Sequence, residues 1–435
     1  MLTQSQLDLF RRKYREDLSA PALCGALART DIRDLAFRPM QAAKLSGEFS
    51  VEVKTRGITF QQNSGRCWMF AVLNMLREKV AERLNLEEFK LSGNYMSFWD
   101  RLEKANNVLE MAIETATKPM LDRSVEYILS GFHDGGYWDM AADLVSKYGV
   151  VPESAMPETY QSTHTSAFMK LLNRKLRADV LELRALVCAG QDPEPRRTEM
   201  LSEIYKMECI AFGEPPATFD FSCRDRDGQL HVWHDLTPKQ FYMEQIGIDL
   251  SQYITITNHP TSGLPMNCHY RFHYIGSMAG SWVRNLNLTQ KELQDLCIRQ
   301  LRDGECVWFG CDSGAHGDRK TGVWDPDSVN YSDLFGGVSL DMSKRDRLES
   351  HESYADHAMI LVGVNLDADG NPDRWKIENS WGEEVGRKGY FVCSQKYFEE
   401  YVYEAIIHRK YLTDAQAALL DTDPMEIPAW YSDWM

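Results

Sequence analysis

Apolar side chains recur at every third or fourth position over a long stretch that begins near Cys67. The repeating positions are Met69, Leu73, Leu76, Val80 and Leu84. This spacing places them on one face of a helix, so the pattern predicts an amphipathic helix. Residues 68–73 are apolar almost all round, and we therefore expect the helix to begin inside a core and to reach the surface later.

Similar patterns predict further helices on both sides of this one. Residues 1–50 read as helical with one polar face, and two more helices are expected over 95–119 and 121–148. Residues 165–212 are expected to form a helical pair that is broken at Gly190–Pro195, because the two prolines of this segment cannot continue a helix. One more helix is expected over 289–302.

The sequence pattern changes after about residue 250, where short strand-like runs replace the helical pattern. They are QYITIT, HYRFHYI, CVWFG, HAMILVGV, RWKIENSW and GYFVCS, rich in β-branched and aromatic residues. The run SVEVKTRGITF before the Cys67 helix is also strand-like, and the residues from Tyr411 onward read as a tail. We therefore expect an α+β protein with a mostly helical half and a β-rich half.

Composition and charge exclude several classes of protein. The 435 residues are 43% apolar and 26% charged, as in an ordinary globular chain. The net charge of −16 disfavours nucleic acid as a partner, because no excess of cations is available to replace the counterions on phosphates. No run approaches the ~20 apolar residues that a membrane-spanning helix needs, so no membrane association is expected.

The ten cysteines contain no Cys-x-x-Cys pair, which argues against a zinc ribbon or a thioredoxin-like site. The opening residues, MLTQSQLDLFRRKYRED, lack the apolar core of a signal peptide, so we expect a cytoplasmic protein with mostly free thiols. Acids at alternate positions of residues 367–373 suggest a calcium loop, but the glycine comes fourth rather than sixth. A hairpin turn is the better interpretation, and we expect no metal and no other cofactor.

Two residue types that carry nucleophilic chemistry stand at the ends of predicted elements. Cys67 opens the long helix, where the positive end of the helix dipole favours a thiolate over a thiol. His357 stands at the start of an apolar strand, from which its ring can point into a cleft. Neither position is decisive alone, because most cysteines are small buried side chains and a histidine at a strand end often contacts only solvent.

A third element, WKIENSWG, places Asn379 beside an indole that could shield a bond between histidine and asparagine from water. The expected hairpin at residues 367–373 would lay the strands of His357 and Asn379 side by side. A glutamine, Gln61, stands six residues before Cys67. A cysteine, a histidine, an asparagine and a glutamine in one cleft would suit acyl transfer through a thioester.

In this order, Gln61, the Cys67-Trp68 pair, Asp-His-Ala at 356–358 and Asn-Ser-Trp-Gly at 379–382 resemble the papain superfamily. Longer strings resemble its bleomycin hydrolase and aminopeptidase C branch, and the likeness runs from about residue 30 to 412. These strings are SGRCW, LSGNYMSFWDRLEKAN, GGYWDM, MPETY, VWFGCD, DHAMILVGV and IENSWGEE.

The resemblance implies a papain-like fold with two lobes, one helical and one β-rich, and an active cleft between them. It implies an N-terminal extension at 1–60, a helical half at 61–159 and a helical insertion for assembly at 160–250. The β-rich half would cover 251–410, and the C-terminal tail, 411–435, would lie near the cleft.

The resemblance also implies a role for each residue of the constellation. Cys67 would attack a peptide carbonyl, and His357 would share its proton and protonate the leaving amine. Asn379 would fix the tautomer of the histidine. The side-chain amide of Gln61 and the backbone N–H of Cys67 would stabilise the oxyanion.

Substrate contacts are expected from four further residues. Gly135 and Gly136 would line the cleft, where an extended peptide bonds to backbone without side chains. Trp381 would cover the pair formed by His357 and Asn379 at the edge of the substrate site. Met435 ends the chain, and in the aminopeptidase branch the terminal carboxylate lies in the cleft and binds the free amine of the substrate.

The tail leaves the exact activity open. After Met425 the chain departs from the pattern of the branch, with ten further residues that include Glu426 and Asp433. One interpretation is a cysteine aminopeptidase whose tail fills the cleft, with Glu426, Asp433 or the terminal carboxylate as anchor. The other is an endopeptidase whose cleft is open.

More distant alternatives are a transglutaminase or amidase, and a scaffold without catalysis. The extended resemblance to the peptidase branch and the intact constellation disfavour both. Members of the branch form hexamers, so a homohexamer acting on peptide substrates is expected. An apolar stripe in the insertion would be buried in such an assembly or inside the subunit, and it consists of Phe168, Leu172, Leu176, Val180 and Leu183.

Overall fold

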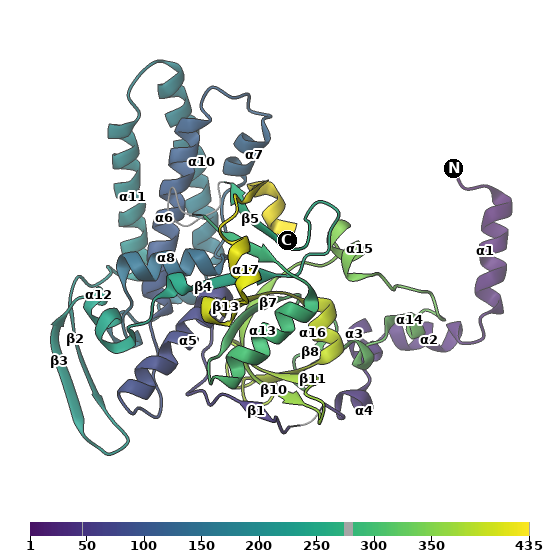
Figure 1. The fold of residues 1–435 in the computed structure, drawn as a ribbon. Helices are drawn as coiled ribbons and strands as arrows, with labels where there is room; N and C mark the ends of the chain where they lie inside the picture. Colours follow the sequence, from purple (N-terminus) through teal and green to yellow (C-terminus); the bar gives the residue numbers. More distant parts are fainter. Residues whose placement is uncertain (46, 274–281, 435) are drawn as a thin grey trace.

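Two hydrophobic cores lie on the two faces of one large sheet in the computed structural model, which describes residues 1–45, 47–273 and 282–434. Neighbouring residues of a strand enter different cores, because successive side chains point to opposite faces. Trp308 and Ala358 face a lobe of helices, whereas Phe309 and Met359 face the opposite core. Figure 1 shows the helical lobe beside the β-rich lobe.

The helical lobe contains the long helices that the sequence predicts. Its helices are α5 (Cys67–Arg83), α6 (Gly93–Glu114), α7 (Arg123–Ser130), α8 (Trp138–Tyr148), α9 (Tyr160–Thr163), α10 (Ser166–Cys188), α11 (Glu194–Phe212) and α12 (Pro238–Phe241). The single helix expected over 121–148 is wrong, because the chain forms α7 and α8 with a loop between them. Gly131 ends α7 with a φ of 86°, which glycine adopts without strain.

The large sheet has twelve strands within the described residues, in the order β14-β5-β6-β4-β13-β7-β10-β11-β12-β9-β8, with β1 paired to β10. Its strands are β1 (Val51–Glu52), β4 (Tyr253–Thr257), β5 (Cys268–His273), β6 (Arg284–Asn287), β7 (Val307–Cys311), β8 (Gly317–Asp318), β9 (Val323–Trp324), β10 (His357–Leu366), β11 (Pro372–Glu378), β12 (Tyr390–Ser394), β13 (Val402–His408) and β14 (Met425–Pro428). The mixed helix and sheet composition confirms the expected α+β class.

The hairpin expected at residues 367–373 is confirmed. Strands β10 and β11 pair antiparallel, with Ile360 opposite Glu378. The Asp367 side chain accepts hydrogen bonds from the backbone N–H of Asp369 and Asn371, at 2.9 and 2.8 Å, which closes the turn. The described residues contain no group of three or more potential metal-ligating side chains. The hairpin carries the strand of His357 back beside the residues that precede Asn379.

The insertion at 160–250 buries its apolar stripe inside the subunit. Phe168, Leu172, Leu176, Val180 and Leu183 belong to the core of the helical lobe, where α10 packs against α6 and α11. The stripe therefore gives no physical reason for an oligomer. The insertion also holds a hairpin that we did not predict, β2 (Phe219–Arg224) and β3 (Leu230–Leu236), although its alternating Phe219 and Phe221 are buried as in a strand.

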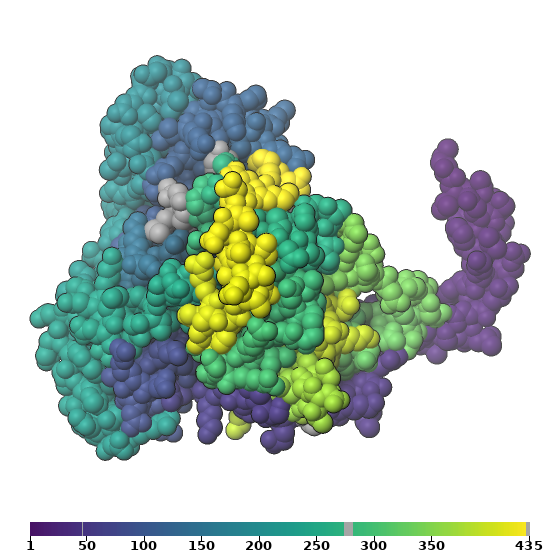
Figure 2. Space-filling model, viewed as in Figure 1, coloured from purple at the N-terminus to yellow at the C-terminus, as the bar shows by residue number. Residues whose placement is uncertain are grey.

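The N-terminal segment forms an arm that extends away from the body of the protein (Figures 1 and 2). It consists of α1 (Gln4–Glu16) and α2 (Ala20–Leu27), and α1 has no buried residue. The next helices, α3 (Ile32–Ala36) and α4 (Pro39–Ala42), pack against the body and each buries one alanine. The longer strand expected around residue 55 is reduced to β1.

The remaining helices cover the β-rich lobe and its edges. They are α13 (Gln290–Arg302), α14 (Tyr331–Leu334), α15 (Lys344–Glu349), α16 (Gln395–Tyr401) and α17 (Asp414–Leu419). The first confirms the helix expected over 289–302. None of the described helices is long and apolar enough to cross a membrane.

The tail is more ordered than its composition indicates. Strand β14 adds to the edge of the large sheet in parallel with β5, and Glu426 on β14 forms an ion pair with Arg271 on β5. The chain then forms a 3-10 helix, η6 (Ala429–Trp434), which packs against α7 and β5. Figure 1 shows this end of the chain near β5.

Candidate active site

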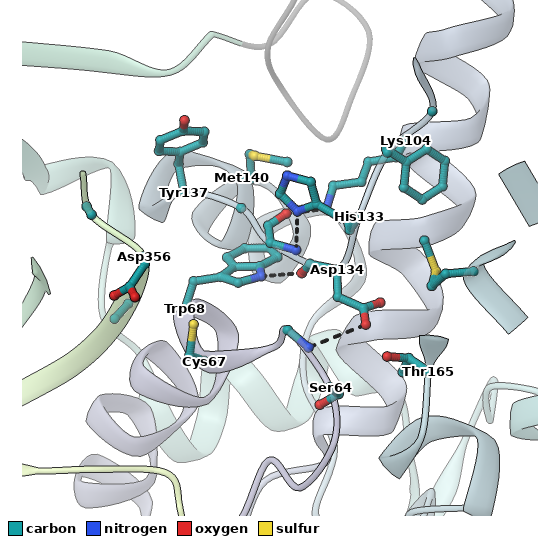
Figure 3. Close-up of a pocket in the computed structure, with 18 of the residues that line it drawn as sticks. Ser64, Cys67, Trp68, Lys104, His133, Asp134, Tyr137, Met140, Thr165 and Asp356 are labelled. Carbon is teal, nitrogen blue, oxygen red and sulfur yellow. Dashed lines mark hydrogen bonds between the residues drawn. The ribbon is translucent and has the colours of Figure 1, made fainter. Parts of the chain in front are cut away.

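Cys67 is the first residue of α5, so its thiol lies at the positive end of a long helix. The loop before it is held from two sides. The buried Arg66 forms an ion pair with Glu158 at 3.0 Å, and the indole of Trp68 donates to the backbone carbonyl of Asp134 at 2.6 Å. Figure 3 shows the thiol between Trp68 and the strand segment that carries Asp356.

His357 is the first residue of β10 and faces Cys67 across the boundary between the lobes. Burial alone would raise the pKa of the Cys67 thiol. The charge of His357 and its hydrogen bond to the thiol outweigh burial, and the backbone N–H groups of Ala358 and Trp68 add to them, so the pKa of Cys67 is lowered. This arrangement favours a thiolate beside an imidazolium.

Asn379 fixes the orientation of the histidine ring. The Nε2 atom of His357 lies 2.9 Å from the Oδ1 atom of Asn379, which is fully buried. Because Nε2 donates to this amide, Nδ1 is the nitrogen left for the thiol. The indole of Trp381 stacks on the imidazole with ring centroids 4.7 Å apart, and Arg319 covers the same indole at 4.0 Å.

Gln61 links the loop before Cys67 to the segment after Asn379. Its Nε2 donates to the backbone carbonyl of Ser64 at 2.7 Å, and its Oε1 accepts from the hydroxyl of Ser380 at 2.7 Å. One N–H of the amide is therefore used, and the second remains for a ligand. Gln61 lines the cleft together with Cys67 and His357.

The cleft between the lobes has a volume of about 1060 Å³. The loop between α7 and α8 forms one wall, and Lys104 on α6 ties it down by donating to the backbone carbonyls of His133 and Gly135 (Figure 3). A Cβ atom at Gly136 would lie 2.7 Å from the indole of Trp68. The close packing of this loop on Trp68 therefore requires glycine at position 136.

The two predicted glycines differ in what they can offer a substrate. Both line the cleft. The N–H of Gly135 already donates to Nδ1 of His133 at 2.9 Å, and its carbonyl accepts from Lys104 at 2.6 Å. The backbone contact expected of the pair therefore rests on Gly136.

The other predicted substrate-binding residues either do not line the cleft or lie outside the residues that the structure describes. Trp381 stacks behind His357 and is not among the residues that line the cleft. Met435 and the side chain of Asp433 lie outside the described residues. Glu426 is paired with Arg271, so it is not a free anchor for a substrate amine.

Among the charged residues that line the cleft, Lys104, Asp134 and Glu404 were not identified from the sequence. Glu404 had a usable signal, because an acid stands inside the apolar run YVYEAII of β13. Lys104 and Asp134 had none, since charged residues are ordinary in a helix and in a loop.

Comparison with known proteins extends these observations to the whole chain. The model of the Peptidase C1-like family matches residues 1–433. Aminopeptidase C of Listeria monocytogenes serovar 1/2a is 40% identical over 431 residues, which cover 99% of this chain and 97% of that protein. Aminopeptidase G of Lactobacillus delbrueckii subsp. lactis is 41% identical over 438 residues, with 99% of both chains covered.

A solved structure resembles this fold closely. The crystal structure of PepW from Lactobacillus rhamnosis HN001 superposes with a TM-score of 0.97 at 39% sequence identity. The match covers 99% of this chain and 98% of that one.

Proposed function

The chain belongs to the Peptidase C1-like family and is a cysteine-type aminopeptidase, and from the site geometry we propose that Cys67 and His357 carry the reaction. The observation that carries this assignment is the lowered pKa of Cys67 beside a histidine whose Nε2 is held by Asn379. We propose peptides as the substrates.

In the acylation half of the proposed reaction, the Cys67 thiolate attacks the carbonyl carbon of the scissile peptide bond. The carbonyl electrons move to the oxygen, where the second N–H of Gln61 and the backbone N–H of Cys67 donate to the oxyanion. The intermediate then collapses, the C–N bond breaks, and His357 gives its proton to the leaving amine. A thioester on Cys67 and a neutral imidazole remain.

In the deacylation half, His357 takes a proton from water while the water oxygen attacks the thioester carbonyl. The second tetrahedral intermediate releases the acid and returns the thiolate and imidazolium pair. Asn379 would keep the ring in one tautomer throughout, because Nε2 stays bonded to its amide oxygen.

The tail governs the choice between removal of terminal residues and internal cleavage in this proposal. In the aminopeptidase interpretation the tail fills part of the cleft, and we call this the plugged form. It is supported by the position of η6, which packs against α7. Three residues of α7 line the cleft, namely Tyr127, Ile128 and Ser130. The alternative is an endopeptidase, in which the tail leaves the far part of the cleft open.

Fluorogenic peptides with free and with blocked amino termini separate these two activities. The plugged form predicts cleavage of free amino termini only, and transfer of activity to blocked peptides when the chain is truncated after Met425. Thermal unfolding of the truncated protein checks that the loss of most of β14 leaves the fold intact. Efficient cleavage of blocked peptides by the full-length protein would instead establish the endopeptidase.

We also propose a homohexamer located in the cytoplasm. Support for an assembly comes from the N-terminal arm, where α1 exposes Leu9, Phe10 and Tyr14 without burying any residue. Light scattering at micromolar concentration tests the assembly, and removal of residues 1–17 should dissociate it if the arm holds it together. A monomeric full-length protein would refute the hexamer and leave the catalytic proposal standing.

A further inference from the structure

The loop that leads to Cys67 is closed by two hydrogen bonds between Gln61 and Ser64. The amide Nε2 of Gln61 donates to the backbone carbonyl of Ser64 at 2.7 Å, and the hydroxyl of Ser64 donates to the backbone carbonyl of Gln61 at 2.6 Å. The same hydroxyl accepts from Nε of Arg66 at 2.9 Å. Because a serine hydroxyl has a single proton, these contacts define its orientation. Figure 3 shows Ser64 in this loop, close to Cys67.

Arg66 connects this loop to a distant segment of the helical lobe. Its side chain is fully buried, and its Nη1 atom lies 3.0 Å from both carboxylate oxygens of Glu158. Glu158 stands just before α9 and accepts a further hydrogen bond from the hydroxyl of Ser162 on that helix. The backbone N–H of Asn63 also donates to the carbonyl of Thr163, at the end of α9. The segment around α9 therefore provides a fixed support for the loop.

The two groups proposed to stabilise the oxyanion stand at the two ends of this loop. One is the second N–H of Gln61, and the other is the backbone N–H of Cys67. The backbone of Gln61 is held from the other lobe, where its N–H donates to the carbonyl of Ser380 at 2.8 Å. Donors of this kind stabilise a transition state only when they already point at the place where the charge develops. The shape of the loop between Gln61 and Cys67 therefore sets the geometry of both donors.

A buried arginine next to the nucleophile could act through its charge or through its bonds. The largest influences that lower the pKa of Cys67 are the charge and hydrogen bond of His357, followed by the backbone N–H groups of Ala358 and Trp68. The charge of Arg66 is paired with Glu158, which weakens its effect at a distance. Its hydrogen bond to Ser64, by contrast, ends directly on the loop. The geometry therefore favours a role through bonds.

We propose that Arg66 is a positioning residue, which holds the hydroxyl of Ser64 and thereby keeps Gln61 aimed at the oxyanion. Glu158 supplies the fixed point for the guanidinium. The inference rests on the proposed function, and it assigns a role to two strings that the reaction itself does not require, namely SGRCW at 64–68 and MPETY at 156–160.

Two variants break the connection at different atoms. Ser64→Ala removes the hydroxyl and leaves the ion pair between Arg66 and Glu158 in place. Arg66→Lys keeps a cation for Glu158, but a single ammonium group does not reproduce the fork that bonds both partners. The matched control is Arg347→Lys, because Arg347 is a buried arginine of α15 that pairs with Glu400 at 2.7 Å and does not line the cleft.

Both variants should lower kcat on fluorogenic peptides about 10–100-fold, with KM little changed, because a misplaced donor loses part of its effect on the transition state. The control should keep the kcat of the wild type. In the background of Gln61→Ala, the change Ser64→Ala should lower kcat less than about threefold, because the donor that it positions is already absent. This non-additivity would not arise if Ser64 only stabilised the fold.

A peptide aldehyde tests the oxyanion donors without turnover. The Cys67 thiolate adds to the aldehyde carbon, and the oxygen of the resulting hemithioacetal takes the place of the oxyanion. Iodoacetamide instead loses iodide when the thiolate attacks its methylene carbon, so no carbonyl oxygen gains charge. In Ser64→Ala and Arg66→Lys, the inhibition constant of the aldehyde should rise about 10–100-fold. The pH profile of Cys67 alkylation should match that of the wild type.

The possible failures can be told apart. Wild-type kcat in both variants, or full additivity with Gln61→Ala, would overturn the inference and leave the proposed function standing. An alkylation profile that shifted together with kcat would also overturn it, because Arg66 would then act on the thiol. Activity in Cys67→Ala would refute the catalytic proposal and this inference with it. If Arg66→Lys lowers the melting temperature, Ser64→Ala decides the outcome, because it keeps the buried ion pair.

Discussion

At the proposed catalytic end of the cleft, the side chains that would orient the reaction are already bonded to their neighbours. His357 bonds to Asn379, and Gln61 bonds to both Ser64 and Ser380. At what we call the Glu404 end, two strands away on β13, Glu404 lies over Gly310, and Asp139 is a second acid beside it. Bonded groups are preorganised for the reaction, whereas a desolvated carboxyl group beside another acid favours its neutral form.

The largest expected effect follows from changing Cys67, because loss of this thiol should stop the reaction for every substrate. Cys67→Ala should abolish turnover of every peptide, and Cys67→Ser should be almost inert because the site lacks a base strong enough to ionise a serine. Steady-state kinetics on fluorogenic peptides measure this. The control is Cys24→Ala, which changes an exposed thiol on the arm and should leave turnover intact.

Alkylation with stoichiometric iodoacetamide at neutral pH adds an independent check. Cys67 has a lowered pKa, whereas burial raises the pKa of Cys209, Cys223 and Cys268. Labelling should therefore occur first at Cys67, as located by peptide mapping, and activity should disappear with it. Modification of another thiol with activity retained would contradict the assignment.

The sequence predicts the catalytic end of the cleft better than the end with Glu404, because the first depends on short motifs and the second on the order of the strands. Cys67, His357, Asn379 and Gln61 could be proposed as one site because they stand at recognisable places, namely a helix start, a strand start and short motifs. The hairpin that joins the last two strands could be predicted from its turn residues. By contrast, the place of Glu404 in the cleft depends on which strands neighbour β13, and a strand order of this length cannot be predicted from periodicity.

The errors of the sequence analysis have the same origin. The helix expected over 121–148 is interrupted at Gly131, because the loop that follows packs against Trp68 and Lys104 from other helices. The tail residue Glu426 was considered as an anchor from its position in the chain, but β14 brings it beside Arg271. Both features depend on tertiary contacts, which local propensity does not contain.

A second prediction concerns Gln61, which we expect to act mainly on the transition state. Gln61→Ala should lower kcat about 10²–10³-fold, the usual effect of losing one oxyanion donor. The decrease should be similar for all peptide substrates, because the oxyanion forms on each of them. If Gln61→Ala changed only KM, Gln61 would contribute to substrate binding and would not stabilise the transition state. Gln62→Ala provides the control, since Gln62 is exposed and is not among the residues that line the cleft.

A third, smaller effect is expected at Asn379. Asn379→Ala should lower kcat about 10–100-fold, because the imidazole loses the bond that selects its tautomer and orientation. The alkylation rate of Cys67 should then rise at higher pH than in the wild type, since a misplaced His357 lowers the pKa of the thiol less. An unchanged alkylation profile with reduced kcat would mean that Asn379 acts through something other than the histidine. Asn371→Ala, in the exposed turn after β10, is the control.

The smallest effect is on stability, and it separates the two ends most directly. The pKa of Glu404 is raised to about 8 from the ordinary 4.5 of a glutamate, so the folded protein holds this proton more tightly than the unfolded chain does. Folding therefore loses stability as pH rises from the unfolded pKa through about 8, where the buried carboxylate must ionise. Glu404→Gln removes this loss.

The variant should accordingly match the wild type near pH 5 and exceed it above pH 8, by about 1–2 kcal/mol once solvent access to the cleft is allowed for. Urea unfolding at the two pH values measures the difference, with Glu399→Gln, which changes an exposed acid of α16 away from the cleft, expected to show none. If Glu404→Gln instead destabilised the protein at high pH, the carboxylate would have a partner inside the fold, and the contrast between the two ends of the cleft would disappear.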